Sequence, residues 1–286
     1  MKIGIAGLGK MGTNHLNELR KDDEFKVAAL YDLRQNAEFK EPFYTNLDEF
    51  LKANLDIVII ATPTSTHLEL AKAILAKVKC VLIEKPLAMN LKEMNEIKEL
   101  AKKHESSVAV GFSERFNPAI LALKKELANE KIISINIKRY SPFPARISDV
   151  GILQDLSIHD IDLVGFLSGE SFAKQGLLSL KKDDREIEAI ITLQSGLNSK
   201  QNIIAAVHQS WNCALKIRLV SVITENAFFE ADLNNFSLQK NGLPLALQGE
   251  SPLFSEHKEL LGLAKSGKMG RLASIKDALN AQACLE

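Results

Sequence analysis

Lys85 is one of a few side chains whose type and setting could do acid–base chemistry. It follows an apolar run, residues 80–83, and precedes Pro86. A proline restricts the residue before it to extended conformations, so we expect the amine at the end of a strand rather than on a helix. A partly desolvated lysine in such a place can exchange a proton with a reacting group. A solvated surface lysine is the alternative, and spacing alone does not separate the two.

Asp155 and His159 form a second candidate pair, four residues apart in a segment with helical periodicity. Positions four apart share a face of a helix. A carboxylate beside an imidazole fixes its tautomer and raises its basicity, as a general base requires. The alternatives are a surface ion pair and a metal site, although no further histidine or cysteine lies nearby. Asp160 and Asp162 could simply form a solvated face.

A glycine-rich turn near the N-terminus has the pattern of a cofactor-binding loop. Gly7, Gly9 and Gly12 follow the apolar residues 3–6 and open a helical pattern. In a dinucleotide site the first glycine permits the tight turn, the second lets the backbone approach a pyrophosphate, and the third lets helix and strand pack closely. Asp32 lies 20 residues after Gly12, where a carboxylate can bond to an adenosine ribose. An ordinary strand–helix turn with incidental glycines is the alternative.

The acid at position 32 favours NAD, because a carboxylate repels a 2′-phosphate and bonds to a free 2′-hydroxyl. Arg34 can accept that phosphate, so NADP is not excluded. The residues expected to bind the cofactor are Gly7, Gly9, Lys10, Met11, Gly12, Asp32, Arg34, Ala61, Thr62, Pro63, His67, Glu84 and Lys85.

The elements that must position these residues alternate between strand and helix in the first third of the chain. Residues 56–61 and 80–83 are continuous apolar runs, typical of strands buried on both faces. This pattern predicts a Rossmann-type, doubly wound parallel sheet over residues 1–117, with ligands at the carboxyl ends of its strands. The segment after Asp32 is compact and leaves little room for a full crossover helix.

The remainder, residues 118–286, has period-two patterning interrupted by one helix over about 153–167 and closed by two C-terminal helices. It predicts an α+β domain with a largely antiparallel, open sheet, and helices at the C-terminus that can pack back on the first domain. One sheet face mixes Ile190, Val220 and Val222 with polar residues. We therefore expect subunits to pack through it, as a homodimer or homotetramer.

Composition narrows the class of protein. The chain has 286 residues and a formal net charge of zero, so no global field attracts nucleic acid or a membrane surface. No apolar stretch approaches about 20 residues, and the N-terminal apolar run is too short for a signal peptide. Three scattered cysteines fit a reducing cytoplasm and form no metal-type pair. His104 and His257 are expected on solvated helix surfaces, and Trp211 and His208 in a sheet.

Taken in order, these motifs resemble one family. They are Gly7-x-Gly9-x-x-Gly12, Ala61-Thr62-Pro63, Glu84-Lys85-Pro86, Gly111-Phe112 followed by residues 115–118, and Asp155-x-x-x-His159. Over nearly its whole length the chain resembles the glucose–fructose oxidoreductase, inositol dehydrogenase and rhizopine-catabolism (Gfo/Idh/MocA) family of NAD(P)-dependent sugar dehydrogenases. The resemblance implies that Lys85, Asp155 and His159 are the catalytic set, in a cleft between the two domains.

Residues 141–151 and 155–162 are similar to those of UDP-N-acetylglucosamine 3-dehydrogenases, which oxidise a sugar hydroxyl on the way to an amino sugar of lipid A. This implies oxidation of the 3-hydroxyl of that nucleotide sugar. An inositol or another sugar is the alternative within the family, and a non-catalytic nucleotide-binding regulator is the alternative outside it. Expected substrate contacts are Arg115, Asn117, Arg139, Tyr140 and Arg146.

Overall fold

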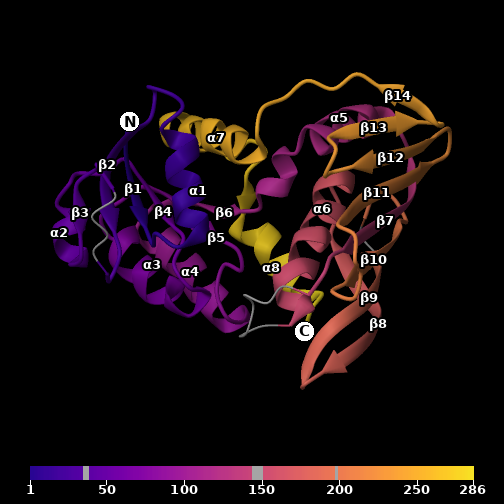
Figure 1. The fold of residues 1–286 in the computed structure, drawn as a ribbon, viewed down its shortest axis with the longest axis horizontal. Helices are drawn as coiled ribbons and strands as arrows, with labels where there is room; N and C mark the ends of the chain where they lie inside the picture. The colour runs from indigo at the N-terminus through magenta and orange to yellow at the C-terminus, as the bar shows by residue number, and fades with distance from the viewer. Residues whose placement is uncertain (35–38, 144–150, 197–198) are drawn as a thin grey trace. The chain divides into compact units, whose positions relative to one another are not determined.

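A computed structural model describes residues 1–34, 39–143, 151–196 and 199–286 (Figure 1). The chain separates into two compact units. The first contains Met1–Ser113 and Leu253–Leu279, and the second contains Glu114–Pro252 and Asn280–Glu286. A parallel sheet lies in the first unit and a largely antiparallel one in the second, which confirms the predicted fold class.

The first unit contains a seven-stranded sheet in the order β15-β6-β5-β4-β1-β2-β3. Its strands are β1 (Lys2–Ala6), β2 (Lys26–Tyr31), β3 (Phe43–Tyr44), β4 (Ile57–Ile60), β5 (Cys80–Glu84), β6 (Ser107–Gly111) and β15 (Ala273–Ser274). All pairs are parallel except β15 with β6. Every residue of β4 and β5 is buried, as a strand covered on both faces requires.

Helices cover both faces of this sheet. They are α1 (Lys10–Leu19), α2 (Leu47–Leu51), η1 (Thr64–Thr66), α3 (His67–Leu75), α4 (Leu91–Lys103), α7 (Pro252–Ser266) and α8 (Ile275–Ala283). Asn46 and Asn90 cap α2 and α4 by accepting a hydrogen bond from a backbone N–H in the first turn. α4 buries Met94, Ile97 and Ala101 on one stripe, the periodicity of an amphipathic helix.

The segment between β2 and β3 is short, as its sequence predicted. Its described residues, 32–34 and 39–42, form no helix. β3 instead pairs directly with β2 in parallel, with Leu30 opposite Phe43.

The second unit contains an eight-stranded sheet in the order β14-β13-β12-β11-β7-β10-β9-β8 (Figure 1). Its strands are β7 (Ile132–Tyr140), β8 (Phe172–Lys182), β9 (Arg185–Ser195), β10 (Ile204–Ser210), β11 (Ile217–Thr224), β12 (Phe228–Asp232), β13 (Ser237–Lys240) and β14 (Leu243–Leu245). β10 and β7 are parallel, and all other neighbours are antiparallel.

One face of the second sheet is covered by helices of the same unit. They are α5 (Pro118–Glu126), a π-helix η4 (Leu153–Ser157) and α6 (Ile158–Ser168). The short 3₁₀ turns η2 (Ser113–Phe116) and η3 (Leu127–Asn129) lie directly before and after α5. α5 packs on β12 and β13, and α6 packs on β7 and β10. Val220 and Val222 are fully buried opposite Ile137 and Ile135 of β7. The expectation that these two valines lie on the open face is therefore wrong.

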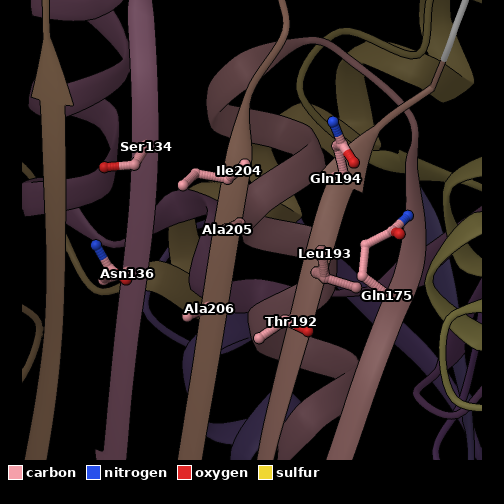
Figure 2. A pocket seen from close by; sticks show the side chains of 9 residues that line it. All are labelled: Ser134, Asn136, Gln175, Thr192, Leu193, Gln194, Ile204, Ala205 and Ala206. Atoms are coloured by element: carbon pink, nitrogen blue, oxygen red, sulfur yellow. The ribbon is translucent and has the colours of Figure 1, made fainter.

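The other face of the second sheet carries a shallow hollow of about 330 Å³ across β7, β8, β9 and β10. Figure 2 shows side chains that line it, among them Ser134, Asn136, Thr192 and Ile204. No described segment of the unit forms a layer over this face. None of the helices in the described ranges is long and apolar enough to cross a bilayer.

Candidate active site

The glycine turn joins β1 to α1 in the first unit. Gly7 has φ of +91°, a conformation that side-chain-bearing residues rarely adopt. A Cβ on Gly12 would lie 1.8 Å from the carbonyl oxygen of Gly7, so the helix packs on the turn without a side chain between them. A Cβ on Gly9 would meet nothing within 4 Å, so the backbone there is open to a ligand. The turn therefore fits a dinucleotide pyrophosphate at a helix N-terminus. Lys10 and Met11 form the first turn of α1.

Asp32 lies beside this turn. Its carboxylate Oδ2 accepts a hydrogen bond of 2.7 Å from the backbone N–H of Leu8. Oδ1 lies 3.4 Å from the backbone nitrogen of Arg34, whose side chain is exposed. The half-buried carboxylate is thus fixed at the end of β2, where it suits a ribose hydroxyl.

The loop after β4 contains Ala61, Thr62 and Pro63. The hydroxyl of Thr66 donates to the Thr62 hydroxyl oxygen and to the Pro63 carbonyl, each at 2.8 Å. Because Pro63 and Thr66 are exposed and Thr62 is half-buried, this self-bonded loop presents its backbone to solvent at the edge of the sheet.

His67 ties this loop to the Lys85 segment from the inside of the unit. Its Nε2 lies 2.9 Å from the carbonyl oxygen of Thr62, and its Nδ1 lies 3.1 and 3.2 Å from the carbonyl oxygens of Pro86 and Leu87. Burial lowers the pKa of His67, and the opposing hydrogen bonds to carbonyls and the charge of Glu84 do not cancel that effect. Because a neutral imidazole has a single N–H, His67 donates to the carbonyl groups of one loop and only contacts those of the other.

Glu84 bonds to the backbone of Lys85 and to a histidine of α1. It is the buried last residue of β5, and its Oε2 lies 3.2 Å from the backbone nitrogen of Lys85. Its Oε1 lies 2.8 Å from Nε2 of His15 on α1. A Cβ at Gly111 would lie 2.9 Å from this carboxyl group, so a larger residue there would displace it. The backbone of Lys85, which precedes a cis peptide bond to Pro86, is thereby anchored.

These groups share one edge of the first sheet. The Gly7 turn, Asp32, the Thr62 loop and Lys85 follow β1, β2, β4 and β5, which are consecutive parallel neighbours. The carboxyl ends of parallel strands are where such sheets bind ligands. The sequence prediction that these four segments meet at one edge is what the fold requires.

In the second unit Asp155 and His159 lie where two kinds of helix meet. Asp155 belongs to the π-helix η4 and His159 to the first turn of α6, and both side chains are half-buried. Single π turns are often found at functional sites. The two residues are four apart, as predicted, but they lie on consecutive π and α segments rather than on one continuous α-helix.

The flanks of His159 are held by buried arginines. Asp162 accepts hydrogen bonds of 2.7 and 2.5 Å from Arg115, and Asp160 accepts bonds of 2.8 and 2.6 Å from Arg139. Asp160 is fully buried and Asp162 nearly so, and the idea that they form a solvated face is therefore wrong. The role of the two arginines in substrate binding stays a prediction. Their contacts in this unit fix the α6 helix.

A third carboxylate completes the network around Arg139. Glu114 accepts hydrogen bonds from Arg139 at 3.1 Å and from Arg218 at 2.8 Å. Burial opposes ionisation of Arg139, but the charges of Asp160 and Glu114 raise its pKa above the ordinary value. The charges of Arg139 and Arg218 outweigh the burial of Glu114 and lower its pKa. Arg139 and Glu114 are therefore both charged at neutral pH.

The other predicted substrate residues have different surroundings. Asn117 is the N-cap of α5, and its side chain also donates to the carbonyl of Leu233 at 3.1 Å. The Tyr140 hydroxyl lies 2.7 Å from Nδ1 of His208 on the open face of the second sheet. Arg146 lies outside the described residues. The substrate role of all three stays a prediction.

Sequence reasoning missed two polar clusters. His257 was expected on a solvated surface, but it is buried, and its Nε2 lies 2.7 Å from Nδ1 of His15. The signal available was His257 flanked by Phe254 and Leu260 within an apolar stripe of α7. Gln209 is fully buried and donates to Asp160 at 2.9 Å. Alternation along β10 could have placed it on the covered face, but not identified its partner.

No group of three or more histidine, cysteine or acidic side chains in the described residues could hold a metal ion. The polar groups of the first unit suit a dinucleotide instead.

Comparison with known proteins agrees with this geometry. A family profile described as an oxidoreductase family with an NAD-binding Rossmann fold, the Gfo/Idh/MocA family, matches residues 1–112. The Rossmann domain is therefore of the NAD-binding type. A solved relative of the fold, GenD2 from gentamicin A biosynthesis in complex with NAD, has a TM-score of 0.85 at 20% identity over 100% of this chain and 92% of its own.

Two curated relatives differ in substrate. The chain is 32% identical over 185 residues to myo-inositol 2-dehydrogenase of Thermotoga maritima. It is 31% identical over 176 residues to UDP-N-acetylglucosamine 3-dehydrogenase of Acidithiobacillus ferrooxidans. Each alignment covers 59% of this chain and only 55% of the relative's length. A solved structure of the latter enzyme has a TM-score of 0.87 at 22% identity, covering 100% of this chain and 95% of its own, which shows a shared fold.

Proposed function

We propose that the chain is an NAD-dependent oxidoreductase that converts a sugar or polyol hydroxyl to a ketone. The observation that carries this proposal is Lys85, whose backbone is anchored by Glu84 at the carboxyl edge of an NAD-binding Rossmann sheet. Relatives of about 30% identity that are named dehydrogenases of inositols and sugars support the reaction class. Three free cysteines fit a cytoplasmic location.

The first unit would hold the cofactor through groups already in place. The backbone at Gly9 and the start of α1 face the pyrophosphate, and the Asp32 carboxylate takes the adenosine ribose. The negative charge of Asp32 disfavours the 2′-phosphate of NADP, and Arg34 is the residue that could offset it. When bound, the nicotinamide accepts a hydride from the sugar carbon.

The proton has to leave the hydroxyl by another route. We assign its removal to His159, with Asp155 orienting the imidazole and stabilising the imidazolium. Lys85 would donate a hydrogen bond to the same oxygen and stabilise the negative charge that develops there. Both groups must come within about 3 Å of that oxygen. Arg115 and Arg139 support this arrangement by holding α6 through Asp162 and Asp160.

For the substrate we propose UDP-N-acetylglucosamine, oxidised at its 3-hydroxyl toward a 3-amino sugar of the lipid A type. Its support is the 31% identity to a dehydrogenase of that name and the similarity of the segment that carries Asp155 and His159. The rival is an inositol, since a myo-inositol dehydrogenase is equally similar. A rival of another class is a regulator that binds the nucleotide without catalysis.

A substrate panel tests these alternatives. The purified chain would be mixed with NAD and, separately, UDP-N-acetylglucosamine, myo-inositol or glucose 6-phosphate, and formation of reduced nicotinamide would be followed by absorbance. We expect the nucleotide sugar to have the highest kcat/KM and NMR of its product to show a ketone at carbon 3. A higher kcat/KM for myo-inositol would overturn the proposed substrate. NAD binding without turnover of any sugar would favour the regulator.

We also propose that two copies of the chain pack through the open face of the second sheet. Leu178, Leu180 and Ile204 are exposed there by 71%, 63% and 58%. Apolar side chains gathered on an uncovered sheet face are typical of a subunit interface.

Light scattering tests this assembly. We expect a dimer or a dimer of dimers, converted to monomer by Ile204→Lys. The matched control is Leu243→Lys, which changes a leucine that is 70% exposed on the edge strand β14 and should leave the assembly intact. A monomer at all concentrations would contradict the proposal.

A further inference from the structure

Three buried side chains in the first unit form a continuous hydrogen-bonded chain that the proposed reaction does not use. They come from β5, α1 and α7. Oε1 of Glu84 lies 2.8 Å from Nε2 of His15, and Nδ1 of His15 lies 2.7 Å from Nε2 of His257. All three are at most 6% exposed. This Glu84–His15–His257 chain ends at the backbone N–H of Lys85, which bonds to Glu84.

The direction of the protons in this chain follows from counting donors and acceptors. Both oxygens of Glu84 are engaged, one by His15 and one by the backbone N–H of Lys85. An ionised carboxylate accepts both bonds, so His15 carries its proton on Nε2. The Nδ1 of a neutral His15 is then an acceptor, and Nε2 of His257 must be the donor.

The far end of the chain supports this direction. Nδ1 of His257 is buried, and no described residue makes a hydrogen bond to it. With the proton on Nε2, this atom is an acceptor lacking a partner. The reverse direction would leave an N–H donor without an acceptor, and orphaned buried donors are the rarer case in proteins. Burial lowers the pKa of His257 well below its usual value, and the charge that His15 would carry when protonated adds to this.

We propose that His257 is a positioning residue whose Nε2–H holds the imidazole of His15 against Glu84, so that Glu84 stays bonded to the backbone N–H of Lys85. Its catalytic consequence depends on the proposed role of Lys85, but the proton arrangement does not. If the donor at His257 is lost, the Glu84 carboxylate still keeps the proton on Nε2 of His15, but Nδ1 becomes a buried acceptor without a partner. The His15 ring then loses one of its two fixed contacts, its bond to Glu84 lengthens, and the support of the Lys85 backbone weakens.

Other charges near this chain are few. The side chain of Lys258, next on α7, bonds to Asp22 and Glu24 on the exposed side of the helix. Glu256 is buried on the preceding position of α7. The ring of Phe25 packs edge-on against His257, with 6.1 Å between ring centres, and His257 is almost fully buried.

Two substitutions of His257 in the full chain separate positioning from packing. His257→Gln keeps an N–H donor that can reach His15, whereas His257→Leu has a similar volume and no donor. Long-range ¹H–¹⁵N NMR of the imidazoles reports each tautomer directly and needs no substrate. We expect the Nε2–H pattern for His15 and a neutral His257 at pH 6.5 in the unaltered protein. His15 should keep the Nε2–H tautomer in both variants, but its Nε2–H resonance should shift and broaden in the Leu variant alone, as the bond to Glu84 lengthens.

The same variants give a kinetic readout. We expect His257→Leu to lower kcat by on the order of 10-fold, with little change in KM for the sugar, and His257→Gln to restore most of the loss. A thermal melt of each variant checks the fold. If the Leu variant does not fold, the tautomers of His15 and His257 are measured in the unaltered protein alone. A protonated His257, or a His15 proton on Nδ1, in the unaltered protein would overturn the proposal. Expected tautomers without turnover of any sugar would count against the proposed function alone.

Discussion

The two units anchor their candidate catalytic residues in different ways. In the first, the Lys85 segment is supported by the Glu84–His15–His257 chain, in which a carboxylate bonds to one imidazole and that imidazole bonds to a second. In the second, α6 is held by full charges, with Arg139 between Asp160 and Glu114. Both clusters are buried, but the first contains an imidazole, His257, whose pKa is lowered by burial, whereas in the second the charges of Asp160 and Glu114 raise the pKa of Arg139. The two supports should therefore fail under different conditions.

The arginine network should show the larger effect on stability. Arg139→Ala leaves Asp160 and Glu114 without their main partner in the interior, so we expect a loss of about 3–5 kcal/mol in the free energy of unfolding. Arg218→Ala is the control, because Arg218 bonds to the same Glu114 but is 45% exposed, and it should cost less than about 1 kcal/mol. Urea denaturation measures both. Equal losses would mean that the burial of Arg139 does not determine how strongly the network stabilises the fold.

Acid titration should reveal the first unit. His67 and His257 have pKa values lowered by burial, so below the unfolded value of 6.5 the unfolded chain takes up protons that the folded chain does not. The free energy of unfolding should therefore fall as pH drops below 6.5, by up to about 1.4 kcal/mol per pH unit for each group. Glu114, whose pKa is lowered, adds to this loss of stability only below its unfolded pKa of 4.5.

Urea melts between those two pH values measure this slope. His257→Gln should remove one group's share, and a variant with the same slope as the unaltered protein would contradict the account.

A smaller effect is expected at the cofactor end of the first unit. Asp32 is fixed by Leu8 beside the glycine turn, so NAD should bind at least about 10-fold more tightly than NADP, a difference of about 1.4 kcal/mol. Asp32→Ala should narrow that gap while leaving the His15 tautomer unchanged. Isothermal titration with both nucleotides decides it. NADP binding as tightly as NAD would remove Asp32 as the discriminating residue.

The sequence predicted local features well. The Gly7–Gly12 turn and the buried strands β4 and β5 depend on residues close together in the chain. The period-two pattern after residue 118 likewise predicted a sheet with one buried face, and β7 shows it.

Long-range polar partners were not predictable in the same way. His257 lies 242 positions from His15, and Arg139 lies 25 from Glu114 and 21 from Asp160. A histidine or aspartate on a helix looks solvated unless the residue that satisfies it is known. The π turn at Asp155 escaped prediction because its composition is that of an ordinary helix.

The most direct test of the central claim is steady-state turnover of Lys85→Ala. A donor that strengthens its interaction as charge develops lowers the barrier more than it tightens substrate binding. We expect turnover to fall by on the order of 100-fold, with NAD affinity and the thermal melt nearly unchanged. Lys85→Arg should not restore it, because a guanidinium is planar, larger and cannot give up a proton. Near-normal turnover by a folded Lys85→Ala protein would contradict the account.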